Sequence, residues 1–395
     1  MTATSEIAVH PLVKAARALL PSIRASVERI EQERRLPDEL VRALSESGVV
    51  RMLVPRSLGG GEIDPITQME VLEVLSYADA SLGWVASIAS GTAWATSFLR
   101  PDVAAELLRD PYAIMVGSFG SPFGGRALAV DGGFRVTGRW PFASGSPHAT
   151  WLVGHSAVID GDQPRPGPGG APLTQVMVFP RSECTVVDTW SSTGLAGSGS
   201  HDFTVEDVFV PEERSFFLYG APDYQTGPLY KARFFLLAHG AHALGIARAA
   251  IDAFLELATD KREARTGAPI RDRAQIQAAV AQAESLVRSG RAYLWETTRQ
   301  VWDEVCSTGE ITPQNRALTR LAISASFDSS MRAIDLMYTA GGGASVYKRN
   351  ALERHFRDIH TVSQHAIVAP SSYELIGQSL LSVSAGIEPT GRPLI

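Results

Sequence analysis

Cysteine is scarce in this chain of 395 residues, which contains two, Cys184 and Cys306, far apart in the sequence. Two distant cysteines give no disulfide framework, and neither has the spacing of a metal or redox motif. We therefore expect no metal site and a cytoplasmic protein. The first residues also lack a basic segment followed by an apolar core, so the sequence predicts no secretory signal peptide.

Long apolar runs and an excess of positive charge are missing too. No run approaches the ~18 residues of a membrane span, which predicts no membrane partner. The net charge is −6, and no basic stripe is visible that would neutralise phosphates, so we expect no nucleic-acid partner. Hydrophobic residues make up 45% of the chain, which is long enough for two or three packed domains.

Hydrophobic periodicity divides the chain into three parts. Residues 1–111 repeat apolar side chains at helical spacing, which predicts an N-terminal α-helical domain. Residues 112–225 consist of short strand-like runs, which predict a small barrel or sandwich. Residues 226–395 return to long Ala/Leu-rich helices with a near-heptad stripe, as expected for a helical bundle. The pattern is therefore that of an α+β protein.

Several elements can be placed more closely. The apolar stripe from Leu12 to Ile30 predicts one long helix. Asp131-Gly132-Gly133, between two strand-like runs, predicts a β-hairpin. The strand-like runs are residues 113–118, 126–131, 134–141, 150–157, 174–179, 184–189 and 203–210.

The stretch Gly138–Trp151 reads as a strand, a Gly-punctuated bend and a second strand. Trp140, Phe142 and Ser144 alternate along it, which predicts that two rings and a hydroxyl share one face of the strand. Such a face suits a planar heteroaromatic ring that needs one hydrogen bond. From the residues alone, the commoner arrangement is a Trp/Phe pair in an ordinary β core, with Ser144 in the turn.

Four stretches in this order resemble the acyl-CoA dehydrogenase superfamily over nearly the whole chain. They are Gly138–Gly145, Gly194–Ser200 followed by Val208–Pro211, Arg265 with Gly267–Ile270, and Ala340–Ala344 followed by Glu353–Asp358. The resemblance implies an acyl-CoA dehydrogenase-like fold, with a central β-barrel domain and a C-terminal four-helix bundle.

The same resemblance implies a flavin site. Phe142 takes the position of an aromatic that packs on the flavin, and Ser144 that of a hydroxyl that hydrogen-bonds the flavin N5. Thr266 replaces the aromatic usual beside the phosphate-binding arginine. The glycine loop contacts the flavin of a neighbouring subunit in this superfamily, which implies a homotetramer. The implied cofactor-binding residues are Trp140, Phe142, Ser144, Ser118, Arg265, Gly341, Gly342 and Gly343.

The catalytic glutamate of the dehydrogenases is absent from its expected position. The register of the C-terminal motif puts Ala366 there, next to His365. Without a carboxylate, that position cannot remove the α-proton of an acyl thioester. An earlier helix offers Asp252 and Glu256, neither in a matching motif. We therefore disfavour an acyl-CoA dehydrogenase-type flavoenzyme and keep it as the alternative.

The stretch Trp140–Trp151 more closely resembles the group D flavin-dependent monooxygenases, the oxygenase components of two-component systems. This resemblance implies that reduced FAD or FMN comes from a separate NAD(P)H–flavin reductase. Reaction with O₂ then gives a C4a-hydroperoxyflavin that hydroxylates an aromatic or polycyclic small molecule. An N-oxygenase of the same fold and a non-enzymatic scaffold that binds no flavin are the other hypotheses.

Two residues are implied to be catalytic. His365 is suited to proton transfer near the flavin C4a because imidazole titrates near neutrality, and Ser144 is suited to hold the N5 proton. Trp84, Thr92 and His148 are implied to lie on the substrate side. Thr92 stands where some of these enzymes have a histidine, which argues against a simple phenol. His365 as a helix cap and His148 as a turn-holding residue are the structural alternatives.

Three further histidines have simpler interpretations. His239 and His242 lie three residues apart on one expected helix and face the same way, but no third ligand is near in sequence. We expect His360 to be structural.

Overall fold

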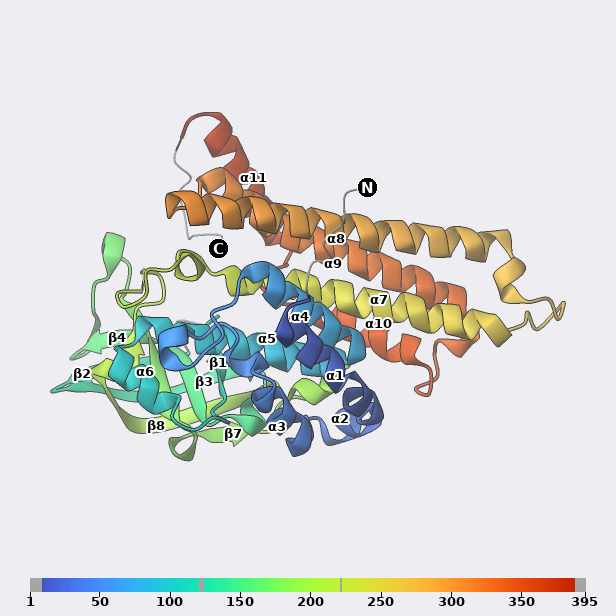
Figure 1. Ribbon diagram of the computed structural model, residues 1–395. Helices are drawn as coiled ribbons and strands as arrows, with labels where there is room; N and C mark the ends of the chain where they lie inside the picture. The colour runs from blue at the N-terminus through green and yellow to red at the C-terminus, as the bar shows by residue number, and fades with distance from the viewer. Residues whose placement is uncertain (1–8, 121–123, 221, 388–395) are drawn as a thin grey trace.

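The computed structural model describes residues 9–120, 124–220 and 222–387 (Figure 1). Residues 1–8, where we expected no signal peptide, lie outside these ranges. The N-terminal helices are α1 (Pro11–Ala25), α2 (Val27–Glu33), α3 (Asp38–Glu46), α4 (Pro65–Ala78), α5 (Ala80–Trp94) and α6 (Pro101–Leu107).

The long helix expected from Leu12 to Ile30 is instead two helices that meet at Ser26. The hydroxyl of Ser26 donates to the carbonyl of Ser22 over 2.9 Å, and Ser26 has a φ of −102°. A serine that bonds back to its own helix competes with the backbone and bends it, which the apolar spacing does not reveal. The next two long helices begin at acidic caps, since Asp64 accepts from Thr67 N and Asp79 from Leu82 N.

The central part is one sheet of nine strands. They are β1 (Met115–Ser118), β2 (Gly125–Val130), β3 (Gly133–Ala143), β4 (Trp151–Asp160), β5 (Gln163–Pro164), β6 (Thr174–Pro180), β7 (Thr185–Val187), β8 (His201–Pro211) and β9 (Ser215–Phe216). The pairing order is β7-β8-β3-β2-β4-β6-β9, with β1 and β5 also on β4. Within the described residues this path has two ends, so the expected barrel is a curved sheet with edges at β7 and β9.

The hairpin expected at Asp131–Gly133 is confirmed. Val130 pairs with Gly133 across the turn, and Gly132 has a φ of +75°, the left-handed conformation that such tight turns need. The longest pairing is between β3 and β8. It contains a register shift between Trp140 and Ala143, at the end that faces the helices of the candidate site.

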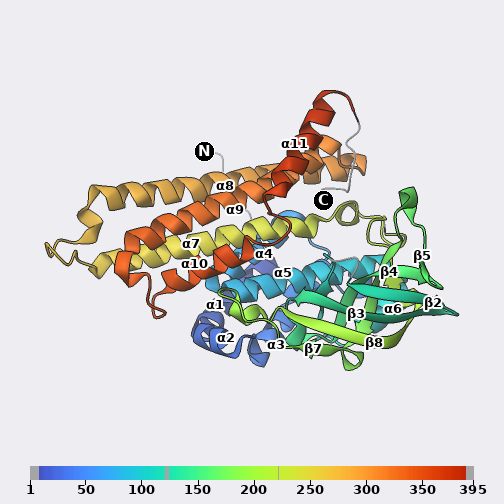
Figure 2. The same ribbon diagram turned by 180° about the vertical axis from the view of Figure 1, so that it is seen from behind.

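The C-terminal part consists of α7 (Leu237–Asp260), α8 (Ala274–Thr308), α9 (Pro313–Gly341), α10 (Ala351–Val362) and α11 (Ser371–Ser384). Helix α7 packs against α4, α8, α9 and α10, and Figure 2 shows it running the length of the bundle. Contrary to expectation, Phe234–Asp260 is long and apolar enough to cross a membrane. Its most apolar window is 83% buried inside the protein, as in the core helix of a bundle.

Helix α5 lies between the sheet and α7 (Figures 1 and 2). Nearly all of its side chains are buried, because one face meets β1 and another meets α4 and α7. Gly83 permits this close approach, since a Cβ there would lie 2.2 Å from the Ser76 hydroxyl of α4. Side chains on α5 can therefore reach both the end of β3 and the start of α7.

Candidate active site

Ser144 and Trp84 lie together, as the sequence predicted for a shared site. Ser144 follows the last residue of β3, is 4% exposed, and accepts a hydrogen bond from the indole Nε1 of Trp84 at 3.0 Å. Its hydroxyl is also 2.7 Å from that of Ser200, which is 2.7 Å from that of Ser198. The Ser144 hydroxyl is thus fixed at the end of a buried serine chain.

His365 also lies next to Trp84. It lies in the segment after α10, and its ring centroid is 5.3 Å from that of Trp84 at an interplanar angle of 72°. Nδ1 of His365 accepts from the amide of Ile367 at 3.3 Å, which leaves the ring proton on Nε2. Burial, with Arg320 nearby, lowers the pKa of His365 to about 4. The ring is therefore neutral at pH 7.

The predicted shared face of Trp140 and Phe142 is wrong. Trp140 is fully buried inside the sheet, where it stacks on Phe203 with centroids 4.8 Å apart and donates to the carbonyl of His155. Phe142 is the extra residue of the bulge, with a φ of +62° and 68% of its side chain exposed. A bulge reverses the alternation, so Phe142 projects outward, away from the buried face on which Trp140 lies.

Two histidines that sequence reasoning left without a role complete the cluster. His239 and His242 of α7 have ring centroids 5.0 and 5.4 Å from Trp84, and His239 is 5.3 Å from His365. Both are buried, and burial lowers the pKa of each. His242 Nδ1 lies 2.7 Å from the Ser76 hydroxyl, whereas His239 Nδ1 and His242 Nε2 have no hydrogen-bond partner in the described structure. Their spacing of three residues was the available signal.

Three further residues were predicted to bind substrate or flavin, namely Thr92, Ser118 and His148. Thr92 lies on α5, buried, two helical turns after Trp84. Ser118 is the last residue of β1. His148 contacts Arg35 and Asp38 near the start of α3, and burial lowers its pKa to about 4. Those contacts are to side chains of another segment and not to the backbone of its own turn, so both interpretations of His148 stay predictions. The binding roles of Thr92 and Ser118 stay predictions.

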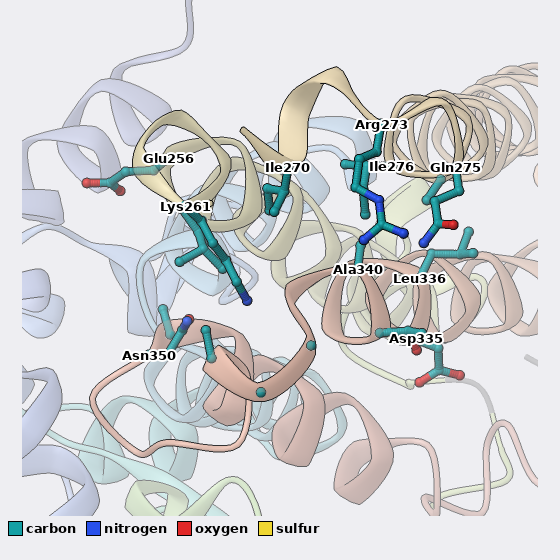
Figure 3. Close-up of a pocket in the computed structure, with 18 of the residues that line it drawn as sticks. Glu256, Lys261, Ile270, Arg273, Gln275, Ile276, Asp335, Leu336, Ala340 and Asn350 are labelled. Atoms are coloured by element: carbon teal, nitrogen blue, oxygen red, sulfur yellow. The ribbon is translucent and has the colours of Figure 1, made fainter. Parts of the chain in front are cut away.

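A second region lies at the other end of α7. It is an open groove of about 1920 Å³ between α7, α8, α9 and the turn after α9, lined among others by Lys261, Arg262, Gly342 and Gly343 (Figure 3). The ammonium of Lys261 donates to the carbonyl of Gly341. Gly342, which ends α9, has a φ of +52° and a ψ of −141°, a conformation almost restricted to glycine.

Two arginines of the loop after α7 differ in their position. Arg265, the predicted phosphate-binding residue, is exposed and is not among the groove-lining residues, whereas Arg262 lines the groove and donates to the carbonyl of Gly267. The phosphate-binding role of Arg265 stays a prediction, and Arg262 is a second candidate in the same loop.

The acids considered for a dehydrogenase are elsewhere. Asp252 accepts from Arg248 at 2.7 Å and from the hydroxyl of Tyr77 at 3.0 Å, and Glu256 lines the groove. At the position expected for a glutamate, Ala366 is exposed and its carbonyl faces Arg320 at 3.5 Å. The group beside Trp84 in that segment is the imidazole of His365.

These residues fit a flavin. The exposed ring of Phe142, with Trp190 edge-on at 6.4 Å, offers an uncovered aromatic surface next to the fixed hydroxyl of Ser144. The groove offers a cationic Lys261 and the backbone of Gly342 and Gly343 for a phosphate or adenylate. A reduced flavin at such a site supplies two electrons to O₂.

Comparison with known proteins defines the class first. Models of the acyl-CoA dehydrogenase N-terminal and C-terminal domains match residues 12–100 and 237–370. The chain therefore belongs to the acyl-CoA dehydrogenase superfamily, and the expected fold is confirmed.

Individual relatives define the branch. The indole-3-acetate monooxygenase of Pseudomonas putida is 32% identical over 366 residues, covering 91% of each chain. The HsaA oxygenase subunit of a flavin-dependent monooxygenase from Mycobacterium tuberculosis is 29% identical over 399 residues, covering 98% of this chain and 99% of its own. XiaF from Streptomyces sp., solved with FADH2 and glycerol, superposes with a TM-score of 0.87, 26% identity and 97% coverage of both chains. The chain is a member of the flavin-dependent monooxygenases of this superfamily, as predicted.

Proposed function

We propose that this protein is the oxygenase component of a two-component monooxygenase that hydroxylates an aromatic small molecule in the cytoplasm. It takes reduced FAD or FMN from a separate NAD(P)H–flavin reductase and uses O₂. One oxygen atom ends in the product and the other leaves as water. The relatives support this assignment, because HsaA is an oxygenase subunit and XiaF was solved with FADH2.

The observation that carries the proposal is the arrangement around Trp84. Its indole nitrogen bonds to Ser144, and its ring contacts His365. A dehydrogenase needs a carboxylate base at the His365 side, and the chain has Ala366 at that position. A hydroxyl and an imidazole are instead suited to holding and moving protons.

Each residue then has a defined task. Ser144, already aligned by Trp84 and Ser200, accepts or donates one hydrogen bond at the edge of the bound ring. With the flavin bound, His365 would offer its Nε2 hydrogen to the reacting oxygen, and in its protonated form it would donate a proton there and return to the neutral ring. A reduced flavin is anionic near neutrality, and an opposite charge next to His365 would raise its pKa toward the working range. Trp84 and the buried faces of α5 exclude water.

The length of α7 supports the homotetramer that the family resemblance implies. His239, beside Trp84, and Lys261, beside the glycine loop, are 22 residues apart, or about 33 Å along the helix. One flavin does not span that distance, so we infer that the glycine loop serves the flavin of a neighbouring subunit. A groove of about 1920 Å³ exceeds the usual size of a small-molecule pocket, as an intersubunit contact would require.

Rapid mixing tests the function. Anaerobic protein loaded with reduced FMN or FAD is mixed with O₂, and the return of the oxidised-flavin absorbance is followed. A long lag is expected, because the site protects activated oxygen from water. The lag should shorten in Ser144→Ala and in His365→Ala. Immediate return of oxidised flavin in the wild type would contradict the proposal. Bleaching of bound oxidised flavin by an acyl-CoA would support a dehydrogenase.

A further inference from the structure

Three arginines converge beyond His365. Arg316 and Arg320 lie one turn apart on α9, and Arg233 lies in the segment that leads into α7. All three are half-buried. Burial, followed by repulsion from Arg233, lowers the pKa of Arg320 to about 10, and burial also lowers the pKa of Arg233. Glu304 attracts Arg316, so the pair whose repulsion a bound anion would relieve is Arg233 and Arg320.

Arg320 carries the strongest evidence for a missing partner. Its Nη2 donates to the hydroxyl of Ser372 at 3.2 Å and approaches the carbonyl of Ala366 at 3.5 Å. Its Nε is buried and has no hydrogen-bond partner in the described structure. A buried charged donor without an acceptor is costly, and such groups are normally satisfied.

Other half-buried arginines of the same bundle form ion pairs with carboxylates. Arg248 pairs with Asp252 and Glu284, and Arg291 pairs with Glu73 at 2.8 Å. Among the described residues, no carboxylate lies within 4 Å of the guanidinium of Arg320 or Arg233. Arg233 lies instead over the ring of Tyr219, 5.3 Å from its centroid. Among the described residues, Arg233 and Arg320 therefore have no carboxylate partner, whereas Glu304 attracts the charge of Arg316.

This charge borders the candidate active site directly. Arg320 contributes to the lowered pKa values of both His365 and His239, the two rings that contact Trp84. It is also bonded to the segment that carries His365. A molecule whose ring lies beside Trp84 and His365 can therefore extend an anionic group toward Arg320.

We propose that the substrate is an aromatic carboxylate, and that Arg320, with Arg233, binds its carboxylate group. This inference rests on the proposed function and specifies its substrate. The planar guanidinium fork matches the two carboxylate oxygens, and the unpaired Nε is the donor that such a bidentate contact uses. The half-buried setting strengthens the attraction, because screening by water is reduced.

Binding measurements with matched ligand pairs test the proposal. Indole-3-acetate is compared with indole-3-acetamide, and 3-phenylpropionate with 3-phenylpropanamide, so that only the charge changes within each pair. Titration calorimetry is done anaerobically on protein loaded with reduced flavin, and again without flavin. We expect the wild type to bind the acid of at least one pair about tenfold or more tightly than its amide.

Substitutions decide whether Arg320 is the source of that preference. Arg320→Gln should bring acid and amide within about twofold of each other, Arg233→Gln should reduce the preference partly, and Arg320→Lys should keep part of it. Arg299→Gln, on the exposed face of α8, is the matched control and should keep the full preference. Thermal unfolding of each variant shows whether it is folded, and a misfolded Arg320→Gln leaves the decision to Arg233→Gln and Arg320→Lys.

Equal binding of acid and amide in both pairs by the wild type would overturn the proposal. An acid preference unchanged in folded Arg320 and Arg233 variants would overturn it too. These outcomes differ from failure of the proposed function. A protein that protects activated oxygen but shows no acid preference has the proposed function and another substrate. One that prefers acids but reacts at once with O₂ has the anion site without the proposed function.

Discussion

The two ends of α7 make opposite use of polar groups. At its start, imidazole, indole and hydroxyl groups around Trp84 are buried, and the histidines are neutral at pH 7. At its end, Lys261 and Gly342 lie in an open groove. The first arrangement suits proton transfer without water, and the second suits the binding of a charged, extended group. Under the proposed function, one helix joins the reaction centre around Trp84 to an anchoring surface, the groove beside Lys261, about 33 Å away.

The largest expected effect concerns the reaction centre. His365→Ala removes the proton-transferring ring and should lower hydroxylated product per O₂ consumed by roughly 100-fold or more, with peroxide released instead. Product and peroxide are both quantified. His360→Ala is the matched control, because His360 bonds to Asp335 at 2.9 Å and contacts Phe356, away from Trp84. Equal losses in the two variants would disprove a specific role for His365.

The second-largest expected effect concerns the anchoring surface, the groove beside Lys261 and Gly342. Gly342→Val forces a branched side chain into a φ of +52° and a ψ of −141°, at a cost of about 1–3 kcal/mol. We expect affinity for reduced flavin to fall about tenfold while the His365 region is unchanged. Gly309→Val is the matched control, since Gly309 also has a positive φ, +78°, a Cβ there meets nothing within 4 Å, and it does not line the groove. Anaerobic flavin titration makes the comparison, and unchanged affinity in Gly342→Val would remove the loop from the flavin site.

A smaller effect is expected for Ser144. Ser144→Ala leaves the Trp84 indole nitrogen without its acceptor, which costs roughly 1–3 kcal/mol of stability. It should also shorten the lag before flavin reoxidation several-fold. Ser90→Ala removes a buried hydroxyl that bonds only within α5, so it should lower stability slightly and leave the lag unchanged. The same lag in wild type and Ser144→Ala would exclude a role at the ring.

The smallest effect is a dependence of stability on pH. Burial lowers the pKa of His242 to about 3 in the folded protein. In the unfolded chain the same imidazole takes up a proton near pH 6.5, so on acidification the unfolded state is protonated first. Stability therefore falls as the pH drops below 6.5. His242 should contribute a loss of about 1 kcal/mol between pH 7 and 5.5. Denaturant unfolding should show a smaller loss in His242→Gln, and an identical loss would disprove this assignment.

Motif positions in the sequence predicted which residues lie near one another. Ser144, Trp84 and His365 were predicted for one site, and the structure brings them together although they come from three parts of the chain, while their roles stay predictions. Sequence reasoning was wrong where a β-bulge changes the direction in which a side chain points. The bulge turned Phe142 outward, away from the buried face that Trp140 shares with Val136, and alternation cannot reveal a bulge.

The arginine cluster could not be predicted from the sequence, for a different reason. Arg233 and Arg320 are separated by 87 positions, and nothing in either local pattern indicates that they meet. Whether a charged side chain has an ion-pair partner depends on the tertiary structure around it. Arg248 and Arg320 look alike in the sequence, and they differ only in that carboxylates reach the first.

The separation of the two ends of α7 has a genetic consequence. If each flavin lies between the reaction centre of one subunit and the glycine loop of another, two defective proteins can repair each other. Mixed tetramers of His365→Ala and Gly342→Val chains contain some sites with both parts intact. Co-expression should then restore activity that neither variant has alone, whereas two variants of the same part should give no complementation.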